Sequence, residues 1–269
     1  MSLENEINRL KKAKLDIKTS LKTKIGLDIS EETTLDKYGE CINNVESTCT
    51  HINGDFYNAR TNNGTDYSNL FYFCQNLTSI DVSNWDTSQV TDMNSMFYYC
   101  QKLTSIDVSN WDTSKVTNMK NMFYCCNKLT TLDVSNWNTS QVTNMSYLFG
   151  YCDDLTDLNV SNWDTSKVTD MERIFHYCKK LTILDLSNFD TSKITSMSYM
   201  FYMCQNLTTL DLSSFNTSNV TSYSRMLQDV PTTCTIYINP ETFINSKTGQ
   251  TFTPSELGWK GTEFTPKYN

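Results

Sequence analysis

The sequence predicts a solenoid of the α/β class, in which short strands and short helices alternate in units of 26 residues. Three observations predict it. Single residues recur at a constant spacing, the sequence between them is nearly the same in each repeat, and each repeat contains one strand-like and one helix-like stretch. A fixed period of about 20 to 50 residues indicates stacked repeats, because one such unit is too small to fold alone.

Two rows of residues define the period of 26. The aromatic row consists of Trp85, Trp111, Trp137, Trp163, Phe189 and Phe215. The cysteine row consists of Cys74, Cys100, Cys126, Cys152, Cys178 and Cys204. A hydrophobic residue would fit the same buried place, so we expect reduced core thiols rather than disulfides.

The strand of one unit is predicted by the stretch "LTSIDVS", in which Leu103, Ile106 and Val108 point inward and the polar residues between them point elsewhere. The stretch "NWDTSKVT" follows. It is rich in Asn, Asp, Ser and Thr, which favour turns by hydrogen bonding to their own backbone, so it predicts a corner.

The helix of the unit is predicted by apolar residues at i, i+3, i+4 and i+7, the spacing of one helix face. In the unit that begins at Leu103 these are Met119, Met122, Phe123 and Cys126. Thr117 or Asn118 would cap the start of a helix of about two turns.

The chain divides into three parts. We expect residues 1–47 to form a helical attachment or oligomerisation segment and residues 48–229 to form the solenoid, with a degenerate capping repeat at 48–73 and six repeats at 74–229. Residues 230–269 are a C-terminal cap, in which Ile236 and Ile238 continue the positions of Leu210 and Leu212 before the pattern stops.

The N-terminal segment has apolar residues at alternating steps of about four and three, the spacing of a short coiled-coil helix. These residues are Leu3, Ile7, Leu10, Ile17 and Leu21. Three heptads are marginally stable alone, so the helix needs a partner. Two interpretations stay open: assembly with other chains, or packing of the helix onto its own solenoid.

Composition excludes several classes of function. The net charge is −8, which argues against a nucleic-acid binder or a protein that binds anionic membranes. No apolar run of about 18 residues and no signal-peptide pattern occurs, so we expect a soluble protein without membrane insertion, made in a cytoplasm. With His51 and His176 as the only histidines and no Cys-x-x-Cys pair, no zinc site is expected.

An acidic row is the first candidate binding surface. It consists of Asp81, Asp107, Asp133, Asp185 and Asp211, with Asn159 in the fourth unit. Three interpretations stay open: solvated residues of a turn-forming row, contact with a basic partner, or calcium binding.

A tyrosine row is the second candidate. It consists of Tyr72, Tyr98, Tyr99, Tyr124, Tyr151, Tyr177 and Tyr202. Tyrosines suit recognition of a glycan or a protein, and they equally suit packing between repeats. His176 stands where other units have Tyr98, Tyr124 and Tyr202, so these four join the acidic row as candidate ligand-binding residues.

Catalysis has no support in the sequence. No Gly-x-Ser-x-Gly, phosphate-binding loop or His-Glu-x-x-His motif occurs, and a lone His176 in a repeat is better explained as drift than as a general base. We therefore expect a protein that is not an enzyme and that uses no cofactor.

The repeats "IDVSNWDTSQVTDMNSMFYYC", "IDVSNWDTSKVTNMKNMFYCC" and "LDLSNFDTSKITSMSYMFYMC" resemble the BspA-type leucine-rich repeats, whose consensus contains "LDxSxxDTSxVTxMxxMFxxC". The resemblance covers more than half of the chain. It implies a leucine-rich-repeat solenoid with strands on one face and helices on the other. It also implies a family found on bacterial surfaces and in phages, where binding is the usual role.

The N-terminal text resembles a helical segment of phage tail and fibre proteins with the pattern "IKxAIxxKGxxVPxxTTxxxYxxxI". The matching positions are Lys18, Ile25, Gly26, Thr33, Thr34, Tyr38 and Ile42. This resemblance implies a virion protein, such as a tail or head fibre or a decoration protein. Such a protein would assemble through its N-terminal helices with other virion proteins and as a homo-oligomer, for example a trimer.

In that interpretation the repeats face a host cell-surface protein or glycan. The alternative is a bacterial surface adhesin or a protein-interaction scaffold built on the same repeats.

Overall fold

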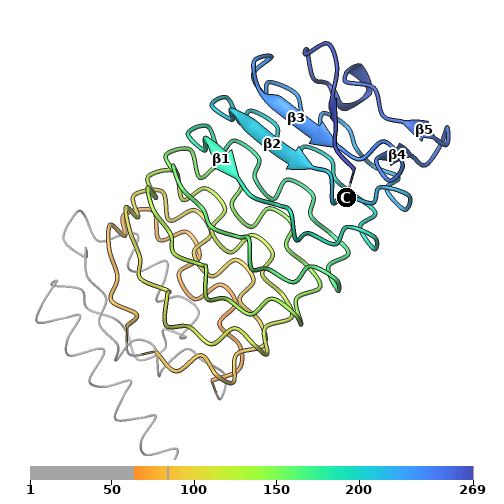
Figure 1. Ribbon diagram of the computed structural model, residues 1–269. Helices are drawn as coiled ribbons and strands as arrows, with labels where there is room; N and C mark the ends of the chain where they lie inside the picture. Colours follow the sequence, from red (N-terminus) through yellow and green to blue (C-terminus); the bar gives the residue numbers. More distant parts are fainter. Residues whose placement is uncertain (1–63, 84, 269) are drawn as a thin grey trace, which may run out of the picture.

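The chain winds in successive coils that stack along one axis (Figure 1). The computed structural model describes residues 64–83 and 85–268. Its regular strands lie in the later coils: β1 (Ile183–Leu184), β2 (Thr209–Leu212), β3 (Thr235–Ile238) and β6 (Thr265–Pro266). A separate antiparallel pair joins β4 (Ile244–Asn245) to β5 (Gln250–Thr251).

A parallel ladder with a 26-residue register runs along one face of the stack. The sheet has the order β1-β2-β3-β6, and Leu210 of β2 lies between Leu184 of β1 and Ile236 of β3. Earlier coils continue this ladder as single bridges, such as those of Thr131 with Ser105 and Asp157. The coil is thus one repeat long.

A second parallel ladder runs along another part of each coil. It links Asp66, Asp92, Asn118, Asn144, Asp170, Ser196 and Ser222, one residue from each of seven successive coils. Asp66, in the degenerate repeat before Cys74, therefore pairs in the same 26-residue register as the clear repeats.

The predicted helix is wrong, and with it the α/β class and the strand-helix unit of a leucine-rich-repeat solenoid. The described residues contain no α-helix; the one helical element among them is the three-residue 3-10 turn η2 (Ser255–Leu257). Met119, Met122, Phe123 and Cys126 are fully buried as the spacing requires, but a run of tandem turns places them there.

Hydrogen bonds show why this run is not helical. The backbone N–H groups of Asn121 and Phe123 donate to Ser146 and Leu148 of the next coil, both at 2.9 Å. The alternate N–H groups close turns within the coil, as Tyr124 does on the carbonyl of Asn121 at 3.0 Å. An α-helix would send every N–H to the residue four before it.

Two residues of each run lie in the left-handed region of backbone space. In the third described coil they are Asn121 (φ 58°) and Cys125 (φ 61°). A non-glycine residue there costs on the order of 1–3 kcal/mol. The hydrogen bonds to the next coil offset that cost. Because these residues are four apart, the turns bury the same stripe that a helix would, and periodicity alone does not separate the two.

The corners are held by short polar side chains. Asp112 accepts a hydrogen bond from the backbone N–H of Ser114 at 2.9 Å, which is the Asx turn expected of a stretch rich in Asn, Asp, Ser and Thr. The buried Thr113 hydroxyl donates to the carbonyl of Asn138 in the next coil at 3.0 Å, and Thr117 donates to Thr91 of the previous coil at 3.1 Å. Polar residues therefore add links between coils.

The core is a set of stacks along the axis of the coil. Trp111 and Trp137 are parallel within 1° with ring centroids 6.4 Å apart, and Phe97 and Phe123 stack at 5.4 Å. The eight described cysteines are free thiols. The Cys126 thiol donates to the carbonyl of Phe97 at 3.2 Å, so it belongs to the core rather than to a disulfide.

The C-terminal part closes one end of the stack (Figure 1). β6 pairs with β3, and the Lys267 ammonium forms an ion pair with Asp211. Gly258 has a φ of 78°, which favours glycine, and a Cβ there would lie 3.2 Å from the Cβ of Gln228. Buried Leu257 accepts the N–H of Leu227 at 2.9 Å and continues the links between coils.

In residues 64–83 and 85–268, no helix has the length and apolar character to span a membrane. The predicted N-terminal helices, with the seam residues Leu3, Ile7, Leu10, Ile17 and Leu21, lie outside the described residues.

Candidate functional site

The acidic row lies along the strand face, and each of its members closes a turn. Asp107 accepts the backbone N–H of Ser109 at 3.1 Å and its hydroxyl at 2.6 Å, and Asp133 does the same with Ser135. Asn159 makes the equivalent bonds to Ser161. Because an amide replaces the carboxylate without loss of the turn, the turn needs the side-chain oxygen and not its charge.

The other members of the acidic row also accept a hydrogen bond from the serine two residues later. Asp81 bonds to Ser83, Asp185 to the N–H of Ser187, and Asp211 to the N–H of Ser213 and to Lys267. Hydrogen bonds from the serine hydroxyls, and then from the serine backbone, hold the pKa values of Asp107 and Asp133 below the usual range.

The described residues contain no group of three or more His, Cys, Asp or Glu side chains placed to hold a metal ion. The carboxylates of the acidic row each hydrogen-bond within their own turn.

The tyrosine row lies on the tandem-turn part of the coil, away from the acidic row. Tyr98 stacks between Tyr72 and Tyr124, with centroid distances of 4.8 and 5.2 Å. Tyr151 and Tyr177 stack at 4.5 Å in a second row beside the first. We call this surface the tyrosine face; it comprises Tyr72, Tyr98, Tyr99, Tyr124, Tyr147, Tyr151, His176, Tyr177, Tyr199 and Tyr202.

Ring stacking determines which atoms of the tyrosine face are exposed to solvent. Ring faces are turned to the rings of neighbouring coils, so edges and hydroxyls are left for solvent, and the tyrosines are half-buried apart from the exposed Tyr72. Burial raises the pKa values of Tyr98 and Tyr124. Their hydroxyls therefore stay protonated at neutral pH and can both donate and accept hydrogen bonds.

Gly150 interrupts the first tyrosine row. A Cβ at Gly150 would lie 2.9 Å from Cδ2 of Tyr124, so the missing side chain makes room for that ring. Tyr124 meets Tyr151 edge to face at 5.5 Å and Tyr147 at 5.7 Å. The face remains continuous where the row loses a residue.

His176 is packed into the tyrosine face rather than presented by it. Its side chain is 6% exposed, and its ring stacks on Tyr202 at 5.2 Å and meets Tyr151 edge to face at 4.9 Å. Burial, with a smaller effect of the Arg173 cation, lowers the pKa of His176 to about 4. The imidazole is neutral at pH 7 and fills a tyrosine position.

A third row of the tyrosine face consists of Tyr147, Arg173, Tyr199 and Arg225, which we call the Tyr-Arg column. Arg173 lies over the rings of Tyr147 and Tyr199, at 5.1 and 4.4 Å, and Arg225 lies 5.8 Å from Tyr199 on its other side. Sequence reasoning missed this column. Its signal is the variability of one repeat position, where earlier coils have Asn69, Ser95 and Asn121.

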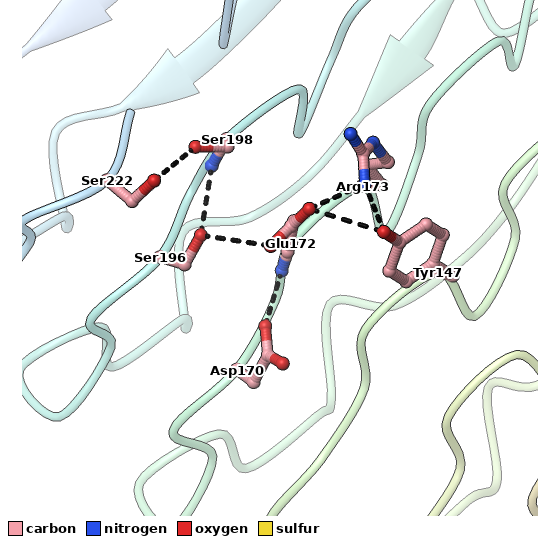
Figure 2. Close-up of polar contacts among 7 residues, drawn as sticks. All are labelled: Tyr147, Asp170, Glu172, Arg173, Ser196, Ser198 and Ser222. Carbon is pink, nitrogen blue, oxygen red and sulfur yellow. Dashed lines mark hydrogen bonds and ion pairs between the residues drawn. The ribbon is translucent and has the colours of Figure 1, made fainter. Parts of the chain in front are cut away.

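A polar network fixes Arg173, as Figure 2 shows. Its Nη1 pairs with Glu172 at 2.6 Å and also donates to the Tyr147 hydroxyl. The backbone N–H of Glu172 donates to Asp170 at 2.9 Å. Farther along the same part of the coil, the hydroxyls of Ser198 and Ser222 meet at 2.7 Å.

A comparison with protein-family models shows the family to which the chain belongs. The family model described as "Mycoplasma protein of unknown function, DUF285" matches residues 41–157 and again residues 127–236, together more than half of the chain. The chain belongs to this DUF285 family. No curated protein matches it significantly.

The core thiols of this DUF285 chain are poor nucleophiles. Burial raises the pKa of Cys204 to about 12, and its thiol donates to the carbonyl of Phe175 at 3.1 Å. Cys125 lies next to Tyr99 and Tyr124, and burial raises its pKa to about 11. A thiolate is the reactive form, so these groups are suited to packing.

Proposed function

We propose that this chain is a non-enzymatic binding protein whose stacked coils display the tyrosine face to a host cell-surface protein or glycan. The observation that carries the proposal is the continuity of the face: tyrosine rings in stacked, tilted or edge-to-face contact run from Tyr72 to Tyr202, passing from the first row to the second at Gly150. Large aromatic surfaces of this kind are typical of recognition sites, because they combine apolar contact with hydrogen bonding.

The rigidity of the face supports the same proposal. Tyr99 and Tyr151 sit at left-handed backbone positions, each held by an N–H donated to the next coil, at 2.7 and 2.6 Å. Side chains that are ordered before binding lose little conformational entropy when a partner arrives. A stack of such coils also repeats the same contacts, so an elongated partner would be bound at several places at once.

We further propose a place in a phage virion, as a tail or head fibre or a decoration protein. The support is the resemblance of the N-terminal text to phage fibre segments. In this proposal Leu3, Ile7, Leu10, Ile17 and Leu21 join chains into a homo-oligomer, such as a trimer, or attach them to other virion proteins. Light scattering on the full chain tests assembly: the L10D/I17D variant should fall to monomer mass.

The second candidate is a bacterial surface adhesin or interaction scaffold. The family's description as a Mycoplasma protein and the BspA-type resemblance favour it. Both candidates use the tyrosine face in the same way, and they differ in the cell that is bound: a bacterium for a phage fibre, an animal cell for an adhesin.

Binding of the labelled full chain to intact bacterial and animal cells, followed by flow cytometry, tests the proposal. The Y72S/Y98S variant removes two rings from the face, and we expect its binding to fall at least about tenfold, the effect of losing about 1.4 kcal/mol. The matched control is I183S, which removes an exposed apolar side chain, 67% exposed, from the strand face.

The circular dichroism melts of both variants identify any loss of fold. The proposal fails if the well-folded Y72S/Y98S variant binds as the wild type does, or if the full chain binds to neither class of cell.

A further inference from the structure

Both arginines of the described residues lie at one end of the tyrosine face. The chain carries a net charge of −8, yet both arginines in the described range belong to the Tyr-Arg column and flank one ring, that of Tyr199. They occupy the same repeat position two coils apart, and their φ values of 57° and 53° show the same left-handed backbone. The fold therefore aims both guanidinium groups at one surface.

The two arginines differ in the ion pairs and hydrogen bonds that their guanidinium groups make within the chain. Arg173 is half-buried and pairs with Glu172 and with the Tyr147 hydroxyl. Arg225 is exposed, and its guanidinium has no ion pair or hydrogen bond within the part of the chain that the structure describes. A guanidinium is a planar fork of donors that matches a carboxylate with two parallel hydrogen bonds. Arg225 thus leaves a carboxylate-binding fork open beside Tyr199.

The backbone of the column is not available to a partner. The N–H groups of Tyr147, Arg173 and Tyr199 donate to Glu172, Ser198 and Ser224 of the following coils, at 2.8, 3.0 and 2.9 Å. An extended peptide binds to a sheet edge through free backbone groups, and this face has none to offer at those three residues. What remains is hydroxyls, ring edges and one open guanidinium. That set suits a partner rich in hydroxyl groups.

We propose that the Tyr-Arg column binds a glycan through a sugar that carries a carboxylate. Arg225 takes the carboxylate, and the edges and hydroxyls of Tyr199 and Tyr202, which meet at 5.6 Å and 70°, contact the sugar ring. Arg173, held between two tyrosines, keeps the column in place. This inference rests on the proposed function, since it names the ligand class for the tyrosine face.

Two pairs of probes test the inference with the full chain and separate two sources of the carboxylate. The first pair is sialyllactose and lactose; the second is oligogalacturonate and its methyl ester. Titration calorimetry should show that at least one acidic probe binds about tenfold or more tightly than its neutral partner. The pair that shows the difference identifies a sialic acid or a uronic acid.

The variant R225Q should remove that preference, because the fork is lost and the neutral contacts are kept. The control K193Q removes one exposed positive charge from a corner of the coil and should leave the preference unchanged. Arg225 is exposed, so its replacement should not disturb the core, and a melt checks this. R225K should restore only part of the preference, since an ammonium lacks the fork.

The inference is overturned if both acidic probes bind no better than their neutral partners, or if R225Q and K193Q behave alike. Failure of this inference is separate from failure of the proposed function. If the wild-type chain binds cells through Tyr72 and Tyr98 while the acidic probes show no preference, the display function stands and the acidic-glycan ligand is wrong.

Discussion

His176 shows how a single residue of the repeat changes the chemistry of its site. Its position holds Tyr124 and Tyr202 in other coils, and the surrounding face accepts an aromatic ring of either kind. A tyrosine in that place has no charge near neutral pH. The histidine must stay neutral to remain buried, so it makes folding sensitive to acid.

Replacement of His176 by tyrosine should therefore remove a pH-dependent loss of stability. The folded pKa is about 4 and the ordinary value is 6.5, so the unfolded chain binds the proton first as pH falls. Stability is complete above pH 6.5 and declines toward pH 4, with a loss of about 2 kcal/mol already at pH 5. Urea unfolding at pH 7 and pH 5 should show this decline in the wild type and a smaller one in H176Y.

Below that window both proteins should lose stability together. Serine hydrogen bonds lower the folded pKa values of Asp107 and Asp133, so these carboxylates stabilise the fold above the ordinary value of 3.8 and lose that effect as pH falls through their folded values. Equal decline of wild type and H176Y between pH 7 and pH 5 would show that His176 does not cause the acid sensitivity.

At the scale of the element, the tandem turn is the feature that sequence reasoning placed but did not identify. The stripe of Met119, Met122, Phe123 and Cys126 was correctly predicted to be buried, and its period of about 3.6 suggested a helix. The decisive property is a backbone angle. Asn121 and Cys125 have positive φ, which glycine would have signalled, but the repeat has no glycine at these positions.

A substitution at Asn121 tests this account of the element. Asparagine tolerates the left-handed region, whereas a β-branched valine does not, so N121V should lower the free energy of unfolding by about 1–2 kcal/mol. N121G should change it by less than about 1 kcal/mol, because glycine adopts that backbone freely. Urea unfolding of the full chain gives both values.

The control is N110V, at an exposed corner asparagine that is not among the residues with positive φ. If N110V and N121V destabilise equally, valine acts through something other than backbone strain. A helix at 119–126 would predict the opposite order for glycine, since glycine is the poorer helix former.

The candidate site was predictable to the extent that it follows the period. Tyr98, Tyr124 and Tyr202 were identified as candidates because they recur, and the acidic row was identified for the same reason, although its members also close turns. Arg173 and Arg225 were missed because they replace Asn and Ser at a variable position. Only the coil shows that this position faces the tyrosines.

At the scale of the whole molecule, the stack implies that a complete coil can be deleted without disrupting the contacts between the remaining coils. Links between successive repeats join residues about 26 apart, such as Leu210 with Leu184 and Ile236. Removal of a full period brings equivalent residues together again. A partial period shifts each buried side chain out of its row, and stability in such arrays depends on contacts between nearest neighbours.

Deletion of residues 129–154 should therefore leave a folded protein. Lys128 would be followed by Leu155, which stands one period after Leu129, and Trp111 would stack on Trp163 in place of Trp137. Deletion of residues 129–141, half a coil, places Val142 where a strand should begin and should abolish cooperative unfolding. Near-ultraviolet circular dichroism of the tryptophans and urea unfolding distinguish the two. If the full-period deletion fails to fold, or both deletions fold equally well, the coil is not an interchangeable unit. The deletion removes Tyr147 of the Tyr-Arg column but keeps Tyr199, Tyr202 and Arg225, so the shortened protein should also keep the ligand preference that depends on Arg225.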